Sequence, residues 1–293
     1  VVQRYTEQGH LQQSLEDFLA KNSPRLKSGA TGQLRKRDEG IVDAAIRVAL
    51  DMDDTCLCLQ GPPGTGKTYT ASQMIKHLLG AGHSVGISSN SHKAILNLMK
   101  AVCETYPELT RATKVGGDAG DLVLGQFPQI RYSNSADARH EQDAGTMIGA
   151  TAWFFAHPAC TGAVDYLFVD EAGQVSVANL VAMSAATKNI VLLGDQMQLG
   201  QPTEGSHPGE SGQSILEYYL HGHQTIPHDR GLFLDTSWRM HPDVCTFISD
   251  AFYEGRLQPE EHTANRVVRL PADGGTLVSK EAGVLYMPVE HEG

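Results

Sequence analysis

The sequence predicts an α/β fold in which a parallel sheet carries helices on both faces, and three observations predict it. Short apolar runs alternate with segments of helical periodicity between residues 55 and 195. Two runs, "YLFVD" and "IVLLGD", are almost wholly apolar, as in strands buried on both faces. A glycine-rich stretch, "GPPGTGKT", separates one apolar run from the helical segment after it. Alternating strands and helices indicate βαβ units, which bind ligands at the carboxyl ends of their strands.

The predicted elements follow in regular order along the chain. Apolar spacing predicts two helices before the sheet, at 11–20 and 38–50, joined by a polar, basic linker. Strands are predicted at 55–60, 83–89, 145–151, 164–172 and 189–195, with helices at 67–79, 91–106 and 176–187. Residues 107–145 are rich in Gly, Asp and Asn, and we expect a small insertion there with short strands near 113–117 and 129–134.

Composition is that of a globular chain of one or two domains. The 293 residues are 41% hydrophobic and 19% charged, which permits a sizeable core. The net charge of -11 argues against attraction of the whole surface to nucleic acid or to an anionic membrane. A local basic groove remains compatible with this charge.

The cysteines point to a reducing compartment. They number five, at positions 56, 58, 103, 160 and 245, and show no paired CxxC spacing. We therefore expect buried thiols, neither a disulfide framework nor a zinc site, and a cytoplasmic location. No apolar stretch reaches about 18 residues, so we expect no membrane partner. The first residue is Val, there is no signal peptide pattern, and we expect a fragment of a longer protein.

The stretch "GPPGTGKT" matches the G-x-x-x-x-G-K-[ST] phosphate-binding pattern between a strand and a helix. Its glycines permit a loop whose N–H groups point at phosphate oxygens, and the helix N-terminus adds positive potential. Lys67 would reach the β- and γ-phosphates, and Thr68 would ligate Mg²⁺. The chain is therefore predicted to be a P-loop NTPase with ATP and Mg²⁺ as cofactors. Its nucleotide-binding residues are predicted to be Gly61, Pro62, Pro63, Gly64, Thr65, Gly66, Lys67, Thr68 and Tyr69.

The acidic half of this site is predicted in "YLFVDEAGQ". Asp170 would hold Mg²⁺, and Glu171 would orient and polarise the attacking water. Adjacent residues on a strand point to opposite faces, so the pair must lie where the strand ends and the chain turns.

Two further segments resemble superfamily 1B helicases, the group that includes the nonsense-mediated-decay helicase. "NIVLLGDQMQLGQP" resembles the third motif of that superfamily, which implies that Gln198 senses the γ-phosphate. "FLDTSWRMHPDVCTFISDAFYEGRL" resembles the segment that opens the second RecA-like domain of these helicases. The resemblance implies that Arg239 reaches the γ-phosphate, although Trp238 stands where the family usually has Tyr. A guanidinium there would neutralise charge on the transferred phosphoryl group.

The same resemblance implies contacts to nucleic acid. "VGISSNSHKAILNLM" resembles motif Ia, so that Ser89, Asn90, Ser91 and His92 would present donors to a phosphate backbone. "GATAW" lies where a further strand-contacting motif occurs, with Thr151 as the expected contact. Trp153 or Phe154 could stack on a base, with core packing as the alternative for both aromatics.

The resemblance covers about residues 40–257 and implies the domain plan. Residues 1–37 would be an N-terminal helix and linker, 38–227 a first RecA-like ATPase domain, and 228–293 the incomplete beginning of a second. It looks closest to bacterial fusions of a RecB-like nuclease with a superfamily 1B helicase. The implied function is a monomeric ATP-dependent translocase on single strands, DNA in preference to RNA, moving 5′→3′.

Two other functions remain open from the residues alone. "GPPGTGKT" followed by an Asp-Glu strand also fits AAA+ ATPases that remodel protein partners. A nucleotide-dependent switch that controls an attached nuclease would need the same phosphate site. Nucleic-acid stimulation of the ATPase would favour the translocase, because neither of the other functions requires it.

Overall fold

The computed structural model describes residues 6, 9–109, 111–134, 145–198, 200, 208–270 and 280–288. The chain divides into two compact units. The first unit comprises Val1–Gln60 and Lys67–Phe233, and the second comprises Gly61–Gly66 and Leu234–Gly293. The first unit therefore includes the N-terminal helix and extends beyond residue 228, where the sequence places the start of a second domain.

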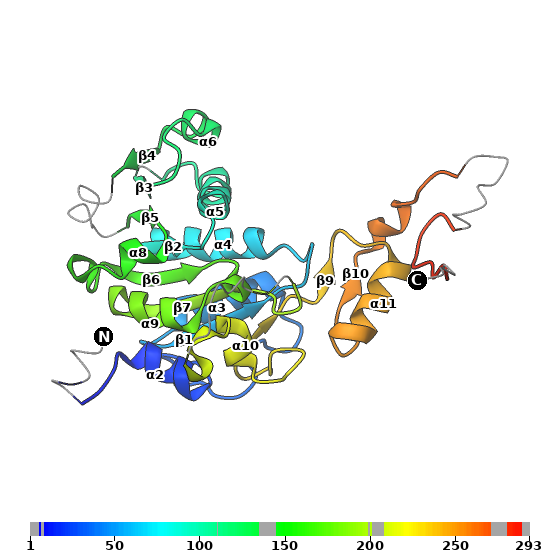
Figure 1. Cartoon of the computed structure of the whole chain (residues 1–293), viewed down its shortest axis with the longest axis horizontal. Helices are drawn as coiled ribbons and strands as arrows, with labels where there is room; N and C mark the ends of the chain where they lie inside the picture. Colours follow the sequence, from blue (N-terminus) through cyan, green and yellow to red (C-terminus); the bar gives the residue numbers. More distant parts are fainter. Residues whose placement is uncertain are drawn as a thin grey trace. The chain divides into compact units, whose positions relative to one another are not determined.

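The first unit is built on one eight-stranded parallel sheet (Figure 1). Its strand order is β4-β3-β5-β2-β6-β7-β1-β8, and every recorded pairing is parallel. The strands are β1 Cys56–Gln60, β2 Val85–Ser88, β3 Ala112–Val115, β4 Ile130–Ser133, β5 Met147–Gly149, β6 Val164–Val169, β7 Thr187–Gly194 and β8 Gly231–Phe233. All five residues of β1 are buried, the apolar run "CLCL" together with the polar Gln60. The α/β fold class predicted from the alternating pattern is confirmed.

Helices cover both faces of this sheet (Figure 1). On one face α3 packs against α4, and α4 packs against α5. On the other face α2 packs against β1 and β7, and α9 packs against α8 and α10. Right-handed crossovers produce this division, because the chain moves along the sheet in one direction from β1 to β4 and in the opposite direction from β4 to β8. The helices are α2 Gln13–Ala20, α3 Ile41–Asp51, α4 Lys67–Gly80, α5 His92–Thr105, α6 Leu122–Gln126, α8 Ala152–Phe155, α9 Val177–Met183 and α10 Ile215–Leu220.

The segment expected to be a small insertion instead extends the main sheet. Its strands β3 and β4 pair in parallel, and β3 pairs with β5. The composition is rich in turn residues, but the short strands still complete the hydrogen bonds that β5 would otherwise leave open. The rest of this segment, residues 135–144, lies outside the described residues.

Strand β8 was placed by the sequence in the second domain, but it pairs with β1 in the first. Gly231 lies opposite Cys58 in the register. A Cβ at Gly231 would lie 2.4 Å from the carbonyl oxygen of Cys58, a contact that no side chain could make. Glycine therefore permits the close approach that adds this last strand.

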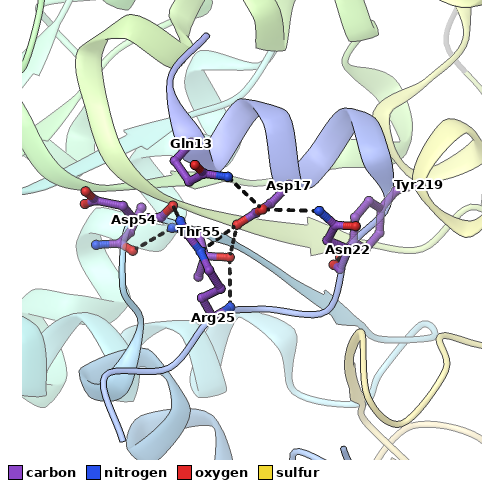
Figure 2. Close-up of polar contacts among 8 residues, drawn as sticks. Gln13, Asp17, Asn22, Arg25, Asp54, Thr55 and Tyr219 are labelled. Carbon is purple, nitrogen blue, oxygen red and sulfur yellow. Dashed lines mark hydrogen bonds and ion pairs between the residues drawn. The ribbon is translucent and has the colours of Figure 1, made fainter. Parts of the chain in front are cut away.

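The N-terminal helix is tied to the start of β1 by a buried carboxylate (Figure 2). Asp17 is 2% exposed and accepts hydrogen bonds from Thr55 Oγ1, Gln13 Nε2 and Asn22 Nδ2 at 2.7, 3.3 and 3.4 Å. The Arg25 Nε atom lies 3.3 Å from the same carboxylate. The N-terminal end of the segment predicted to be a linker is thus part of the first unit.

The second unit contains the loop Gly61–Gly66 together with a short C-terminal subdomain. Strands β9 Thr236–Ser237 and β10 Gln258–Pro259 pair in parallel, and α11 Pro242–Phe252 packs against β10. His241 Nδ1 caps the start of α11 by accepting a hydrogen bond from Asp243 N at 3.2 Å.

All five cysteines are buried free thiols, and burial raises the pKa of Cys58 to about 12. None of the described helices is both long enough and apolar enough to cross a membrane.

Candidate functional site

Three strands of the first unit end at one edge of the sheet and place the candidate ATP site there. Strand β7 lies between β6 and β1. In the register, Gln60 lies opposite Gly194, and Val169 lies opposite Leu192. The segments that follow β1, β6 and β7 therefore leave the sheet side by side. These segments carry the predicted lysine, the Asp-Glu pair and the "GDQMQL" stretch.

Two of the three glycines in the predicted phosphate loop have the left-handed backbone that favours glycine. Gly64 and Gly66 have φ angles of 78° and 82°, in the left-handed region that favours glycine. Thr65 is buried, and its Oγ1 donates to Pro62 O at 2.7 Å, which closes the loop on itself. Helix α4 begins directly after this loop at Lys67. Thr68 and Tyr69 follow in its first turn and are both exposed, Tyr69 to 58%.

Asp170 and Glu171 occupy the turn after β6. The strand ends at Val169, and Glu171 has a φ of 53°, so the chain turns where the pair begins. Burial and the neighbouring Glu171 charge raise the pKa of Asp170 to about 6. The Glu171 N–H, which donates to Asp170 Oδ1 at 2.9 Å, and the Lys67 ammonium act in the opposite direction on this pKa. The structure thus brings Lys67 and Asp170 within electrostatic reach of each other.

The "GDQMQL" segment forms a compact turn at the end of β7. Asp195 is 3% exposed, and its Oδ1 accepts a hydrogen bond from Met197 N at 3.2 Å. Gln198 Nε2 donates to Asp195 Oδ2 at 3.3 Å. The glutamine predicted to sense the γ-phosphate is therefore held by Asp195, beside the acidic turn.

Backbone packing joins the turns after β6 and β7. A Cβ at Gly173 would lie 2.9 Å from the carbonyl oxygen of Asp195. A Cβ at Gly194 would lie 3.0 Å from Ala172 N and 2.7 Å from Leu216 Cδ1. Both glycines are required for this close approach, because backbone atoms cannot move aside as a flexible side chain can. The turns after β6 and β7 are therefore in direct backbone contact.

Gln60 is a site-supporting residue that sequence reasoning missed. It is fully buried at the end of β1, and its Nε2 donates to Gln196 Oε1 at 2.8 Å and to Gln224 O at 2.9 Å. Its Oε1 accepts a hydrogen bond from Ile226 N at 2.7 Å. A polar residue ending the apolar run "CLCL" was the available signal. Gln60 fixes the carboxyl end of β1 to the "GDQMQL" turn.

Arg239 lies against the phosphate loop within the second unit. Trp238 N donates to Gly64 O at 2.8 Å. A Cβ at Gly64 would lie 2.4 Å from Arg239 Cβ, so glycine is needed here for space as well as for its φ angle. Ser237 Oγ accepts from Met240 N at 3.2 Å and supports the turn that carries the exposed arginine. The arginine predicted to reach the γ-phosphate thus starts beside the loop that would hold it.

The predicted nucleic-acid residues after β2 do not all face solvent. Ser89 is 2% exposed, and its Oγ accepts a hydrogen bond from Ser91 N at 3.3 Å. Ser91 caps α5 by accepting from Ala94 N, and Asn90 Nδ2 donates to Gln174 O beside the acidic turn. Ser89 therefore supports the loop through a hydroxyl that is buried in this structure. Its contact with a nucleic-acid strand stays a prediction. Asn90, Ser91 and His92 are exposed.

Thr151 and Trp153 follow β5 at the same edge of the sheet. Thr151 is half-buried at the start of α8, and its side chain makes no capping hydrogen bond. Trp153 is 87% exposed, whereas Phe154 and Phe155 are buried. Core packing is thus the role of Phe154, and Trp153 is the aromatic side chain available to a ligand.

The donor set fits Mg²⁺ held mainly by a nucleotide. Thr68 and Asp170 supply a hydroxyl and a carboxylate, and Mg²⁺ prefers such oxygen ligands, with phosphates and water completing its octahedron. Within the described ranges, no group of three or more His, Cys, Asp or Glu residues could hold a metal ion by itself. A cation at Asp170 would favour the carboxylate form and so oppose the burial and the Glu171 charge that raise the pKa of Asp170.

Family models and curated relatives agree with this geometry. Two family models, each described as an AAA domain, match residues 43–210 and 212–288. The first alone covers more than half of the chain. The DNA replication ATP-dependent helicase/nuclease DNA2 of Xenopus laevis is 26% identical over 256 residues, which span 85% of this chain and 24% of that protein.

A second group of relatives carries a different name. The ATP-dependent helicase upf1 of Schizosaccharomyces pombe is 26% identical over 263 residues, covering 72% of this chain and 27% of that protein. The chain thus spans about a quarter of the length of these relatives. Among solved structures, an arterivirus nonstructural protein 10 (helicase) in complex with DNA matches with a TM-score of 0.46 and 17% identity, covering 74% of this chain and 44% of that one.

Proposed function

Because the chain belongs to the AAA domain family and is a superfamily 1 helicase-like ATPase, we propose that it is the first motor domain of a translocase on single-stranded nucleic acid. One observation carries the proposal. Lys67, the Asp170–Glu171 turn and the Asp195–Gln198 turn follow three strands whose carboxyl ends lie at one sheet edge. An ATP site there borders the turns after β2 and β5, and these turns would hold the nucleic-acid strand.

The chemistry follows from the residues in place. Thr68 and Asp170 would hold Mg²⁺, which would supply positive charge that offsets the charge of the phosphates. Lys67 would hold the phosphates, and Glu171 would orient a water for in-line attack. Arg239 would add positive charge beside the phosphate loop. Gln198, restrained by Asp195, would respond to loss of the γ-phosphate.

Coupling between the ATP site and a bound nucleic-acid strand would pass through two short connections. The close packing of Gly173 on Asp195 links the acidic turn to the Gln198 turn. The hydrogen bond from Asn90 to Gln174 O links the acidic turn to the turn after β2. A change at the γ-phosphate would thereby reach Asn90, Ser91 and His92, which we propose contact the strand backbone with Thr151. Trp153 would stack on a base.

DNA is the favoured strand, and a nuclease domain elsewhere in the full protein is the favoured partner. The support is the match to proteins whose names include DNA replication and helicase/nuclease. Movement in the 5′→3′ direction and likeness to RecB-like nuclease fusions rest on the motif resemblance. A monomeric, cytoplasmic protein remains part of the same proposal.

The decisive experiment is the ATPase rate of the full-length protein with and without single-stranded DNA and RNA. We expect stimulation by DNA that exceeds stimulation by RNA. A rate that ignores both strands, together with ring assembly, would favour an AAA+ protein remodeller. If the protein is a nucleotide-dependent switch, the Glu171→Gln variant should still control the attached nuclease. If it is a motor, the same variant should stop translocating.

A further inference from the structure

Lys114 is a lysine of β3 whose ammonium group is fully enclosed. Its side chain is 1% exposed, and its Nζ lies 2.7 Å from Gly116 O, 2.9 Å from Val115 O and 3.0 Å from His92 Nδ1. An ammonium group has three N–H donors and no acceptor. The three neighbours thus use all three donors, provided that His92 Nδ1 is the unprotonated acceptor.

A glycine turn supports the His92 ring from β3. Gly116 and Gly117 have φ angles of 68° and 85°. A Cβ at Gly117 would lie 3.0 Å from His92 Cγ, and a Cβ at Gly116 would lie 3.4 Å from His92 Cε1. The ring therefore rests on backbone that only glycine leaves open, while Lys114 fixes its Nδ1. The glycine turn and Lys114 together set the orientation of the ring.

We propose that Lys114 is a positioning residue that holds His92 in the tautomer with hydrogen on Nε2 and directs this N–H to a strand phosphate. The proposal rests on the proposed function, because it assumes that a strand lies at this sheet edge. Nε2 has no hydrogen-bond partner within the described part of the chain, and His92 is exposed. Lys114 is too buried to touch the strand itself.

The charges of the pair agree with this arrangement. Burial lowers the pKa of Lys114 to about 8, with Asp121 acting against the shift, so the ammonium form still dominates at neutral pH. Burial and the Lys114 charge both lower the pKa of His92 below its usual value. His92 is then a neutral imidazole whose N–H is on Nε2. This N–H donates a hydrogen bond to a phosphate oxygen without adding charge.

A first test needs no nucleic acid. Nitrogen-15 labelling of histidines, with His92→Gln to assign the signal, reports the protonation of each ring nitrogen by NMR. We expect an unprotonated Nδ1 and a protonated Nε2 for His92 at neutral pH, and loss of this preference in Lys114→Met. The opposite tautomer, or an imidazolium, in the wild-type chain would overturn the inference even if the chain binds DNA.

The second test measures affinity for fluorescein-labelled oligothymidine by anisotropy over a series of KCl concentrations. We expect His92→Ala to bind about three- to tenfold more weakly, as for loss of one neutral hydrogen bond. Lys114→Met should lower the affinity by the same factor. The double variant should bind no more weakly than either single variant. Lys100→Met, which changes an exposed-face lysine of α5, is the matched control and should bind as the wild type does.

Salt dependence separates positioning from direct contact. A neutral donor releases no counterion, so the slope of log affinity against log salt should stay unchanged in Lys114→Met. A slope reduced by about 1 would mean that Lys114 contacts a phosphate itself, against the inference. Full affinity with lowered thermal stability would assign it a structural role only, again against it. If Lys114→Met does not fold, Gly117→Ala, which displaces the ring, should show the same three- to tenfold loss.

Failure of the proposed function looks different from failure of this inference. A wild-type chain that does not bind oligothymidine would contradict the nucleic-acid site as a whole. A wild-type chain that binds while His92→Ala binds equally well would contradict the role of His92 and Lys114 alone.

Discussion

The Asp17 carboxylate accepts a hydrogen bond of 2.7 Å from Thr55 Oγ1 and so connects the N-terminal helix to the residue that precedes β1 (Figure 2). Thr55 N in turn donates to Asn189 Oδ1 on β7 at 3.2 Å. Residues 134 positions apart in sequence thus meet near the amino ends of the neighbouring strands β1 and β7. The carboxyl ends of these strands lead to the candidate ATP site, so this network fixes the ends of β1 and β7 that lie away from that site.

Asp17→Ala should destabilise the protein by about 2–4 kcal/mol, because it leaves the buried hydroxyl of Thr55 without its acceptor and removes the ion-pair partner of Arg25. Urea unfolding followed by circular dichroism measures the change. Asp38→Asn alters a carboxylate that is 93% exposed and serves as the control, with an expected change of less than about 0.5 kcal/mol. Equal stability of the two variants would show that the Asp17 network contributes little.

The Glu39–Arg47 pair should make stability depend on acid pH. Arg47 Nε and Nη2 each lie 2.7 Å from a Glu39 carboxylate oxygen, and this pairing lowers the pKa of Glu39 to about 2. Because the unfolded chain has the ordinary pKa of 4.5, the contribution is complete above that pH and is lost as pH falls toward 2. Both side chains are partly exposed, so we expect roughly 1–2 kcal/mol after allowing for solvent screening.

Comparison with Glu39→Gln isolates this contribution. Free energies of unfolding of the two proteins should differ most at neutral pH and converge as pH approaches 2. A difference that stays constant over this range would show that the carboxylate charge is not what stabilises the pair.

Gly173→Ala should impair ATP hydrolysis more than it impairs ATP binding. The added Cβ would lie 2.9 Å from Asp195 O and push the "GDQMQL" turn away from the acidic turn. We expect a stability loss of about 1–3 kcal/mol and a lower kcat with a smaller change in nucleotide affinity. Steady-state ATPase kinetics and fluorescent-nucleotide binding measure the two effects.

Gly80→Ala is the matched control for this change, because a Cβ there meets no atom within 4 Å. Gly80 ends α4, where alanine should be neutral or slightly stabilising. If both variants behave like the wild type, the contact between the two turns does not limit catalysis.

Glu171→Gln should keep ATP binding and lose about 10²–10⁴ of the hydrolysis rate, the usual contribution of a positioned general base. Amide and carboxylate have the same shape, so the turn with φ of 53° should persist. Circular dichroism checks the fold, and a radiolabelled-phosphate assay gives the rate. A rate within a few-fold of the wild type would assign the base to another residue.

Trp153 should report strand binding through its own fluorescence. The chain has two tryptophans, so Trp238→Phe leaves Trp153 as the sole indole. Stacking on a base should quench its emission on addition of oligothymidine, and Trp153→Ala should weaken binding by about 1–3 kcal/mol. Unchanged emission at saturating strand, with affinity intact in Trp153→Ala, would remove Trp153 from the interface.

Much of the fold and of the ATP site could be read from local patterns. The glycine loop before Lys67 and the acidic pair after "YLFV" each depend on a few consecutive residues whose backbone demands are strict. Strands β3, β4 and β8 were harder, because their pairing depends on partners far away in sequence. Gly231 illustrates this, since its need for close contact with Cys58 is invisible in the residues around it.

The sequence by itself determined the α/β class, the phosphate loop and the acidic turn, because binding a phosphate requires particular backbone angles and charges within one short segment. Only the tertiary structure decided that Gln60 and Asp195 brace that site, that Ser89 is buried, and that Lys114 meets His92. Each of these depends on how strands lie beside one another in the sheet. Side chains from distant segments then share hydrogen bonds that no local pattern encodes.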